Sequence, residues 1–250
     1  ANGSIDVPAS VPCVAHEALL SAGVLRGDPL YRFRELEWAW AAREDWTFEA
    51  SFALAVDGCG PSQGERVDCK LLDGRSVLRM EGVDTVASVW INGVGLGSTA
   101  SAFVRHELSI NAGVLRRGSN TLRVTLGSAL RYARERSEAY PYEVPHTQYY
   151  HVWSEPSHRN FVRKPASDFG WDWGPSFVPT GLTGAMSLRA PQESTAELEG
   201  VAMSAGQPEG VPMAAEARDE AAVAQAKALG TEARKRRLEE LYQETVAEYK

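Results

Sequence analysis

The sequence predicts an all-β sandwich of the jelly-roll type with an α-helical C-terminal extension. Short segments with alternating or β-branched apolar residues recur through the first 190 residues. Turn residues separate these segments, and the composition changes sharply after them. We therefore divide the chain into a β-domain at 1–190, a linker at 191–212 and a helical tail at 213–250.

The expected strands are segments in which apolar side chains alternate with polar ones or dominate. They are 46–55, 76–83, 85–93, 102–110, 120–130 and 184–191. Asn92-Gly93 is a strong signal for a hairpin turn because both residues tolerate positive φ, and 116–120 is expected to form another turn. Two parts of the domain are not expected to be strands. One is a short helix or irregular turn at 16–25, and the other is a long polar loop at 131–160.

The end of the chain has a different character from the β-domain. Residues 192–210 are rich in Glu, Gly, Ser, Pro and Ala, which is typical of a linker without a core. The tail is dense in strong helix formers, and one face of its second helix carries Leu238, Leu241, Tyr242 and Val246. Because an isolated helix of this length is marginal in water, this face needs something to pack on. Its own β-domain and a partner chain are both open, and we favour a partner because the linker gives the helix reach.

Composition argues against several classes of partner. The net charge of −7 does not suit nucleic acid or an anionic membrane surface. No apolar run approaches the roughly 20 residues that cross a bilayer. A Cys59–Cys69 disulfide is open, whereas His146, His151 and His158 lack the companions of a zinc site. We therefore expect no metal and no cofactor; the compartment stays open, an organelle reached after removal of a presequence included.

Four motifs follow one another along the β-domain. They are "VPCVAHEALLSAGVLRGDPLYRF", "EDWTFEASF", "MEGVDTVASVWINGVGLG" and "NFVRKPASDFGWDWGPSF". Together they resemble the N-terminal domain of the β-mannosidases in glycoside hydrolase family 2, from about Val11 to about Arg189. The resemblance implies a galactose-binding-like jelly roll.

The resemblance also implies a sugar-contacting loop. In the family, the Trp-Asp-Trp loop lies over the mouth of a catalytic barrel, and its aspartate helps to hold the terminal mannose. Carried over by position, Asp172 is the sugar-contacting carboxylate and Trp171 the adjacent wall, while Trp173 is expected in the core. A carboxylate can accept hydrogen bonds from two sugar hydroxyls, and an indole covers the apolar side of the ring. Local backbone capping remains an alternative role for Asp172, and His16 matches a family histidine that we expect to be a core hydrogen-bonding residue.

Several positions depart from the family pattern, mostly polar ones. Cys13 replaces a glycine, Arg34 replaces an asparagine, 101–104 reads Ser-Ala-Phe-Val in place of Asn-Met-Phe-Arg, and 166–168 reads Ala-Ser-Asp in place of Gln-Cys-Ser. No first strand is evident before Val11, so one sheet edge is expected to be open or filled by another chain.

The catalytic groups of the family are not evident in the sequence. Retaining glycosidases need two carboxyls about 5 Å apart, and in this family both are glutamates on a barrel of about 250 residues. The family's acid/base glutamate follows an asparagine, but none of the five asparagines here precedes a glutamate. We therefore expect no enzyme but a non-catalytic accessory or structural subunit of a larger assembly. The alternatives are a carbohydrate-binding module with a weak mannose site and an N-terminal part of a β-mannosidase.

Overall fold

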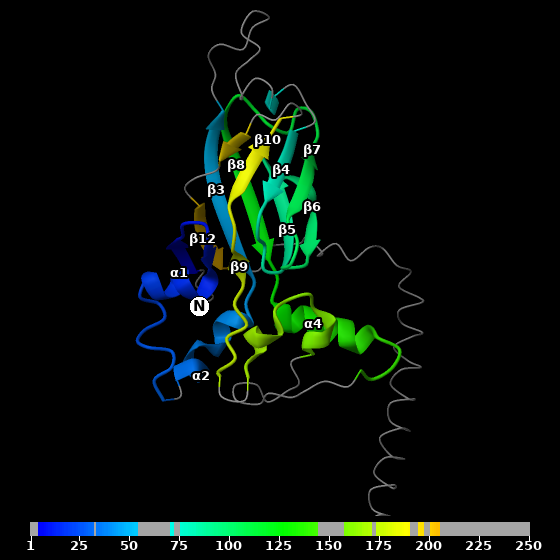
Figure 1. Ribbon diagram of the computed structural model, residues 1–250. Coiled ribbons are helices and arrows are strands. Elements are labelled where there is room, and N and C mark those ends of the chain that lie inside the picture. Colours follow the sequence, from blue (N-terminus) through cyan, green and yellow to red (C-terminus); the bar gives the residue numbers. More distant parts are fainter. Residues whose placement is uncertain are drawn as a thin grey trace, which may run out of the picture.

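The computed structural model contains two β-sheets packed face to face (Figure 1). It describes residues 5–32, 34–54, 71–72, 76–144, 158–171, 174–190, 195–197 and 201–205, the last two ranges for their backbone. The six-stranded sheet has the order β1-β12-β3-β8-β5-β6. Its strands are β1 Ile5–Pro8, β12 Val201–Ala205, β3 Trp46–Leu54, β8 Gly118–Leu126, β5 Val86–Ile91 and β6 Val94–Ala100.

The second sheet is smaller and has the order β11-β10-β4-β7. Its strands are β11 Thr195–Glu197, β10 Met186–Arg189, β4 Ser76–Met80 and β7 His106–Ile110. A separate antiparallel pair joins β2 Cys13–Val14 to β9 Gly181–Leu182. The all-β sandwich predicted from the sequence is thus confirmed for the described residues.

Short helices gather at one end of the sandwich (Figure 1). They are α1 Ala15–Ser21, α2 Arg34–Trp38, η1 Ala39–Ala42, α4 Ala129–Ala139, η2 Arg159–Phe161 and η3 Ala166–Phe169. No helix in the described part of the chain is long and apolar enough to cross a membrane.

The core forms because alternate side chains of the strands point between the sheets. Along β3, Trp46, Phe48 and Ala50 are buried, as the alternation in the sequence predicts. They belong to one large cluster with Leu78 and Met80 of β4. A smaller apolar cluster lies at the helical end, where it joins α4 to the segments around η2 and η3. Its members are Ala39, Ala42, Val86, Ala129, Ala133, Val162, Phe169 and Val178.

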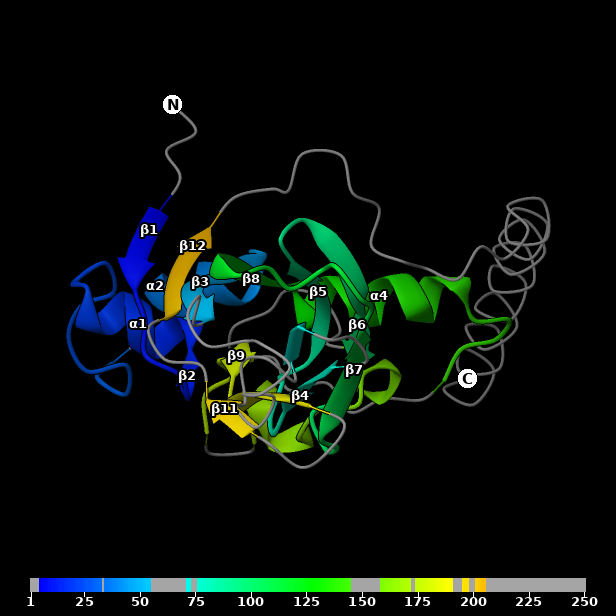
Figure 2. The same ribbon diagram turned by 90° about the horizontal axis from the view of Figure 1, so that it is seen from above.

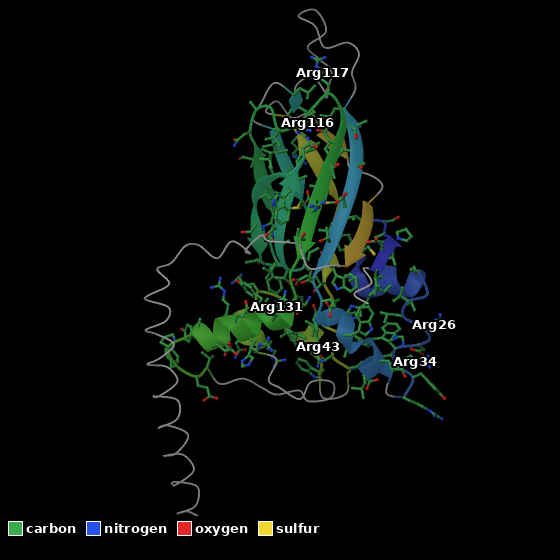
Figure 3. The ribbon with its side chains drawn as sticks, turned by 180° about the vertical axis from the view of Figure 1, so that it is seen from behind. Arg26, Arg34, Arg43, Arg116, Arg117 and Arg131 are labelled. Carbon is green, nitrogen blue, oxygen red and sulfur yellow. The ribbon has the colours of Figure 1, made fainter. Side chains whose placement is uncertain are left out.

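Helix α4 corrects the prediction of a loop at 131–160. Ser128 caps its N-terminus, because the Ser128 hydroxyl accepts a hydrogen bond from the Arg131 amide. Asp45 fixes the helix to the sandwich by accepting from the Ser128 amide at 2.8 Å and from the Arg131 guanidinium. Figure 3 shows Arg131 and Arg43 close to this junction. The abundance of charged residues suggested a loop, but Ala, Leu, Arg and Glu are also strong helix formers.

The hairpin signal at Asn92-Gly93 is confirmed, and the strand after it was missed. Both residues have positive φ, 52° and 80°, and they join β5 to β6. The second strand, 94–100, contains two glycines and few apolar residues, so it lacks the usual strand pattern. The strand expected at 102–110 begins only at His106 in the structure.

The sheet edge expected to be open is filled by the chain itself. Strand β12 pairs along β3, and β1 pairs along β12 (Figure 2). The region 191–212, predicted to be a linker, therefore contains two strands that extend both sheets. Both β1 and β12 are short, and β1 ends in a proline, which is tolerated at a sheet edge. The helical tail at 213–250, with Leu238, Leu241, Tyr242 and Val246, lies outside the described residues.

The pairing of β12 predicts that the domain needs the chain as far as Ala205. A chain of residues 1–210 keeps both added strands, whereas residues 1–190 lose the strand that joins β1 to β3. We expect the shorter chain to melt at least about 5 °C lower, because a change of 1 kcal/mol shifts Tm by about 2–4 °C in a domain of this size. Thermal unfolding of both chains and of the full chain measures this effect. Equal melting temperatures for the two truncated chains would contradict it.

Candidate functional site

A buried lysine lies at the helical end of the sandwich. The side chain of Lys164 has no exposed surface. Its ammonium donates to the carboxylate of Asp84 and to the carbonyl oxygen of Pro179 at 2.6 Å, and it forms an ion pair with Oδ2 of Asp168 at 2.8 Å. An ammonium has three N–H donors, and three oxygen atoms from separate segments surround this one. We call Lys164, Asp84 and Asp168 the ionic cluster.

Asp84 attaches the ionic cluster to the sandwich. It lies between β4 and β5, where its backbone exchanges two hydrogen bonds of 2.9 Å with Gly181, and its peptide bond to Thr85 is cis. The Thr85 hydroxyl donates to the second carboxylate oxygen of Asp84. The carbonyl of Thr85 in turn accepts from the Thr99 hydroxyl of β6 at 2.9 Å. Every one of these partners is buried, so Asp84 is held from several sides.

Asp168 attaches the ionic cluster to a surface hairpin. Its carbonyl accepts from the Val178 amide at 2.9 Å, and Trp171 and Gly174 exchange backbone hydrogen bonds of 3.1 and 3.2 Å. Gly170 permits this path because its φ is +94°, and a Cβ there would lie 3.2 Å from the Gly174 carbonyl oxygen. We call the described residues 168–171 and 174–178 the Trp171 hairpin.

The structure describes one of the two predicted sugar-contacting residues. Trp171 lies on the surface with 43% of its area exposed, and its role as the wall of a sugar site stays a prediction. Asp172, and Trp173, which was expected in the core, lie outside the described residues. The roles of both therefore stay predictions.

His16 lies beside the ionic cluster and is buried as predicted. Its ring packs edge to face on Phe177 at 6.2 Å between centroids, and Phe177 also contacts Trp38 of α2. The expected hydrogen bonding is not found, because neither ring nitrogen has a partner among the residues that the structure describes. Burial, followed by the positive charge of Lys164, lowers the pKa of His16 from 6.5 to about 4. The neutral ring is thus the form that the fold accommodates.

A second surface loop adjoins the segment that carries Lys164. The Ala102 amide donates to the Arg163 carbonyl at 2.9 Å, next to Lys164 in the chain. Phe103 and Val104 of this loop are exposed. These two apolar side chains stand where the family pattern has Phe and Arg, so the loop offers an apolar surface instead of a guanidinium.

No metal site appears in the described part of the chain. Groups of three or more His, Cys, Asp and Glu side chains that could hold an ion are absent there. His158 is described, while His146 and His151 are not, so the histidine trio remains untested. Cys59 and Cys69 also lie outside the described residues.

Sequence reasoning did not assign a role to Lys164 or Asp84. The lysine was visible in the Arg-Lys pair before the Trp-Asp-Trp motif, and Asp84 was visible only as an interruption between two strands. Their ion pair joins positions 80 residues apart. Short-range spacing cannot reveal such a contact, and the only local signal is the separation of Lys164 from Asp168 by four residues.

The lowered pKa of His16 predicts a loss of stability in mild acid. The unfolded chain takes up this proton near pH 6.5, whereas the folded chain does so only near pH 4. Between these values the unfolded state binds more protons, so the free energy of unfolding falls as the pH falls from about 6.5 to about 4. The loss approaches about 3 kcal/mol for a shift of this size.

Urea unfolding at pH 7.5 and pH 4.5 measures this loss. His16→Phe keeps an aromatic ring against Phe177. We expect this variant to show a smaller difference in the free energy of unfolding between pH 7.5 and pH 4.5. His106→Gln is the matched histidine control and should leave the difference unchanged. A pH dependence that His16→Phe does not alter would exclude the buried ring as its source.

Comparison with known proteins agrees with the fold and the motifs. Residues 1–184 match the family described as "Glycosyl hydrolase 2 galactose-binding domain-like". Over 182 residues the chain is 37% identical to the β-mannosidase of Capra hircus, covering 72% of this chain and 19% of that protein. It is 30% identical to β-mannosidase A of Emericella nidulans over 70% of this chain and 17% of that protein.

A solved structure gives the same relationship. The β-D-mannosidase of Dictyoglomus thermophilum superposes with a TM-score of 0.60 at 29% identity, covering 75% of this chain and 22% of that one. The chain spans about a fifth of the length of these relatives, and the matched part is their N-terminal domain. The chain therefore belongs to the galactose-binding-like N-terminal domain family of glycoside hydrolase family 2, of the β-mannosidase type.

Proposed function

We propose that this chain is a non-catalytic domain of the β-mannosidase type, which contacts the terminal mannosyl unit of a β-mannoside through its Trp171 hairpin. The observation that carries the proposal is the exposed indole of Trp171 on a hairpin whose base is fixed by a buried ionic cluster. The printed names of the relatives, β-mannosidases, indicate the class of sugar.

The chemistry of the hairpin suits a sugar. An exposed indole offers a flat apolar surface for the C–H side of a pyranose ring. The next residue in the chain, Asp172, brings a carboxylate that can accept hydrogen bonds from sugar hydroxyls. The rigid base matters because hydrogen bonds to a sugar require partners that are already in position.

The carboxylates of the ionic cluster do not suit catalysis. Retaining glycosidases use two carboxyls about 5 Å apart, and Asp84 and Asp168 are the pair that the cluster brings together. Both form an ion pair with Lys164, and Asp84 is buried. A substrate cannot reach a buried carboxylate that is already bonded on both oxygens. We therefore assign no catalytic role to these two carboxylates.

Mannoside binding tests the proposed contact. We expect the full chain to bind methyl β-mannoside with a Kd above about 100 μM, which corresponds to a binding free energy weaker than about −5.5 kcal/mol, because one hairpin covers one side of the sugar. NMR titration measures affinities in this range. Trp171→Ala and Asp172→Ala should each abolish saturable binding. Tyr31 is an exposed aromatic residue on the segment between α1 and α2, and Tyr31→Ala is the control that should leave binding unchanged.

Two outcomes would contradict the proposal. Binding that survives both hairpin substitutions would place the sugar elsewhere. Hydrolysis of an aryl β-mannoside that persists through repurification and disappears on one Glu substitution would show that the chain is catalytic.

A second candidate function, accessory subunit of a larger assembly, is favoured by the distribution of exposed apolar side chains. At the helical end, large apolar residues are exposed on three separate segments. They are Leu20, Val24, Leu30, Tyr31 and Leu36 in the segment from α1 to α2, Phe103 and Val104 in the loop between β6 and β7, and Tyr140 and Tyr142 after α4. Exposed apolar surface of this kind is typical of protein contacts, so this end of the domain is suited to face another protein surface.

The tail gives this second candidate its test. If Leu238, Leu241, Tyr242 and Val246 form a docking face, the double substitution Leu238→Asp/Tyr242→Asp should abolish association with the native assembly, because it places two charges in an apolar contact. Gln243→Asp, which adds one charge at a polar position, should leave association intact. Sedimentation of the purified native complex measures the mass in each case. Retained association in the double variant, with a Tm lowered by many degrees, would assign the tail to its own domain.

A further inference from the structure

We propose that Lys164 is a positioning residue for sugar recognition. Its ammonium sets the place of the Trp171 hairpin relative to the sandwich and thereby sets the affinity for a β-mannoside, without touching the sugar. This inference rests on the proposed function for its sugar readout, but its structural part can be tested without any ligand.

The three acceptors of Lys164 come from three different segments. Asp84 lies between β4 and β5, Asp168 lies in η3 at the start of the hairpin, and Pro179 follows the end of the hairpin. The ammonium thus contacts both ends of the Trp171 hairpin and the sheet at one point. A displacement of the hairpin base must lengthen at least one of these contacts.

Because Lys164 is buried, its contacts with Asp84 and Asp168 determine where its ammonium lies. A buried ammonium without its acceptors is unfavourable because desolvation is not compensated. Hydrogen bonds between charged groups are stronger than those between neutral groups. Asp84 is held by Gly181 and Thr85, so the position of the ammonium follows the sandwich. Asp168 then follows the ammonium.

The other contacts of the hairpin base involve no buried charge. Phe169 and Val178 pack in the smaller apolar cluster with Ala133 of α4, and the Val178 amide bonds the Asp168 carbonyl. Apolar packing is non-directional and tolerates sliding, whereas a buried ammonium loses stabilisation when its carboxylate partner moves away. A binding site loses affinity when the residues that contact the ligand are not held in position by the residues behind them. Lys164 is the group in this structure that supplies that support.

Substitution at Asp168 separates positioning from folding. The Asp168 side chain is 22% exposed, and removing it leaves the buried pair of Lys164 and Asp84 in place. Asp168→Ala removes both the charge and the acceptor, whereas Asp168→Asn retains an acceptor for the ammonium. Glu49→Ala is the matched control, because it removes a carboxylate that pairs with Arg123 at 2.9 Å on an exposed sheet face.

The first measurement is hydrogen exchange of the Trp171 and Gly174 amides in the full chain without ligand. We expect Asp168→Ala to accelerate their exchange at least about tenfold, Asp168→Asn to give a smaller effect and Glu49→Ala to give none. Thermal unfolding should show that the domain of each variant stays folded. Unchanged exchange in Asp168→Ala would overturn the positioning role of Lys164.

The second measurement is the affinity for methyl β-mannoside by NMR titration. We expect Asp168→Ala to weaken it about fivefold or more, with partial rescue in Asp168→Asn. Faster amide exchange with unchanged affinity would overturn the link between hairpin position and recognition. Faster exchange together with no binding by the unsubstituted chain would support the positioning role of Lys164 while contradicting the proposed sugar contact.

Discussion

The hydrogen bonds of the Lys164 ammonium connect the sandwich to its surface hairpin. A charged group with no exposed surface is stable only where its partners are complete, because the lost hydration must be replaced. Asp84, Asp168 and the Pro179 carbonyl provide that replacement. The three segments that carry them must therefore come together at the same time. The ionic cluster therefore determines how these segments are arranged at this end of the domain, and it contributes less to net stability.

The sandwich meets that condition through a close approach of backbones. Gly181 pairs with Val14 in the β2–β9 pair and with Asp84 on its other side. A Cβ at Gly181 would lie 2.3 Å from the Cys13 carbonyl oxygen and 2.5 Å from the Val14 Cα, so only glycine fits. The segment after the Trp171 hairpin thus passes between the N-terminal segment and Asp84. The approach of Gly181 to Val14 and Asp84 therefore positions both the β2–β9 pair and the end of the hairpin.

Local sequence patterns predicted those parts of the fold that depend on neighbouring residues. The alternation in β3 and the turn at Asn92-Gly93 were found because burial and positive φ leave a direct mark on residue types. Helix α4 and strand β12 were missed, since a charged helix resembles a loop and a short strand of small residues resembles a linker. The exposed Trp171 was found through the motif that contains it, not through its surroundings.

The ionic cluster lies beyond what such patterns contain. Its central pair joins Lys164 to Asp84 across 80 residues, and neither residue type is usual in a core. A lysine before the hairpin is as compatible with a solvated surface as with a buried site. Only the fold, which brings the β4–β5 connection against the segment before β9, distinguishes the two. Sequence reasoning is therefore weakest for the residues that fix a site, and stronger for those that present it.

The exposure of Trp171 has a consequence for the proposed recognition. Sites for small ligands usually enclose most of the ligand surface, whereas one indole and one carboxylate contact a sugar from one side. The exposed apolar residues at the helical end, among them Tyr31 and Tyr142, are suited to meet a second protein surface. If such a surface encloses the sugar from the opposite side, the hairpin contributes orientation and the partner contributes enclosure. The position of the hairpin then matters more than its own affinity for the sugar. A second surface can complete a site only around a contact whose position is already set.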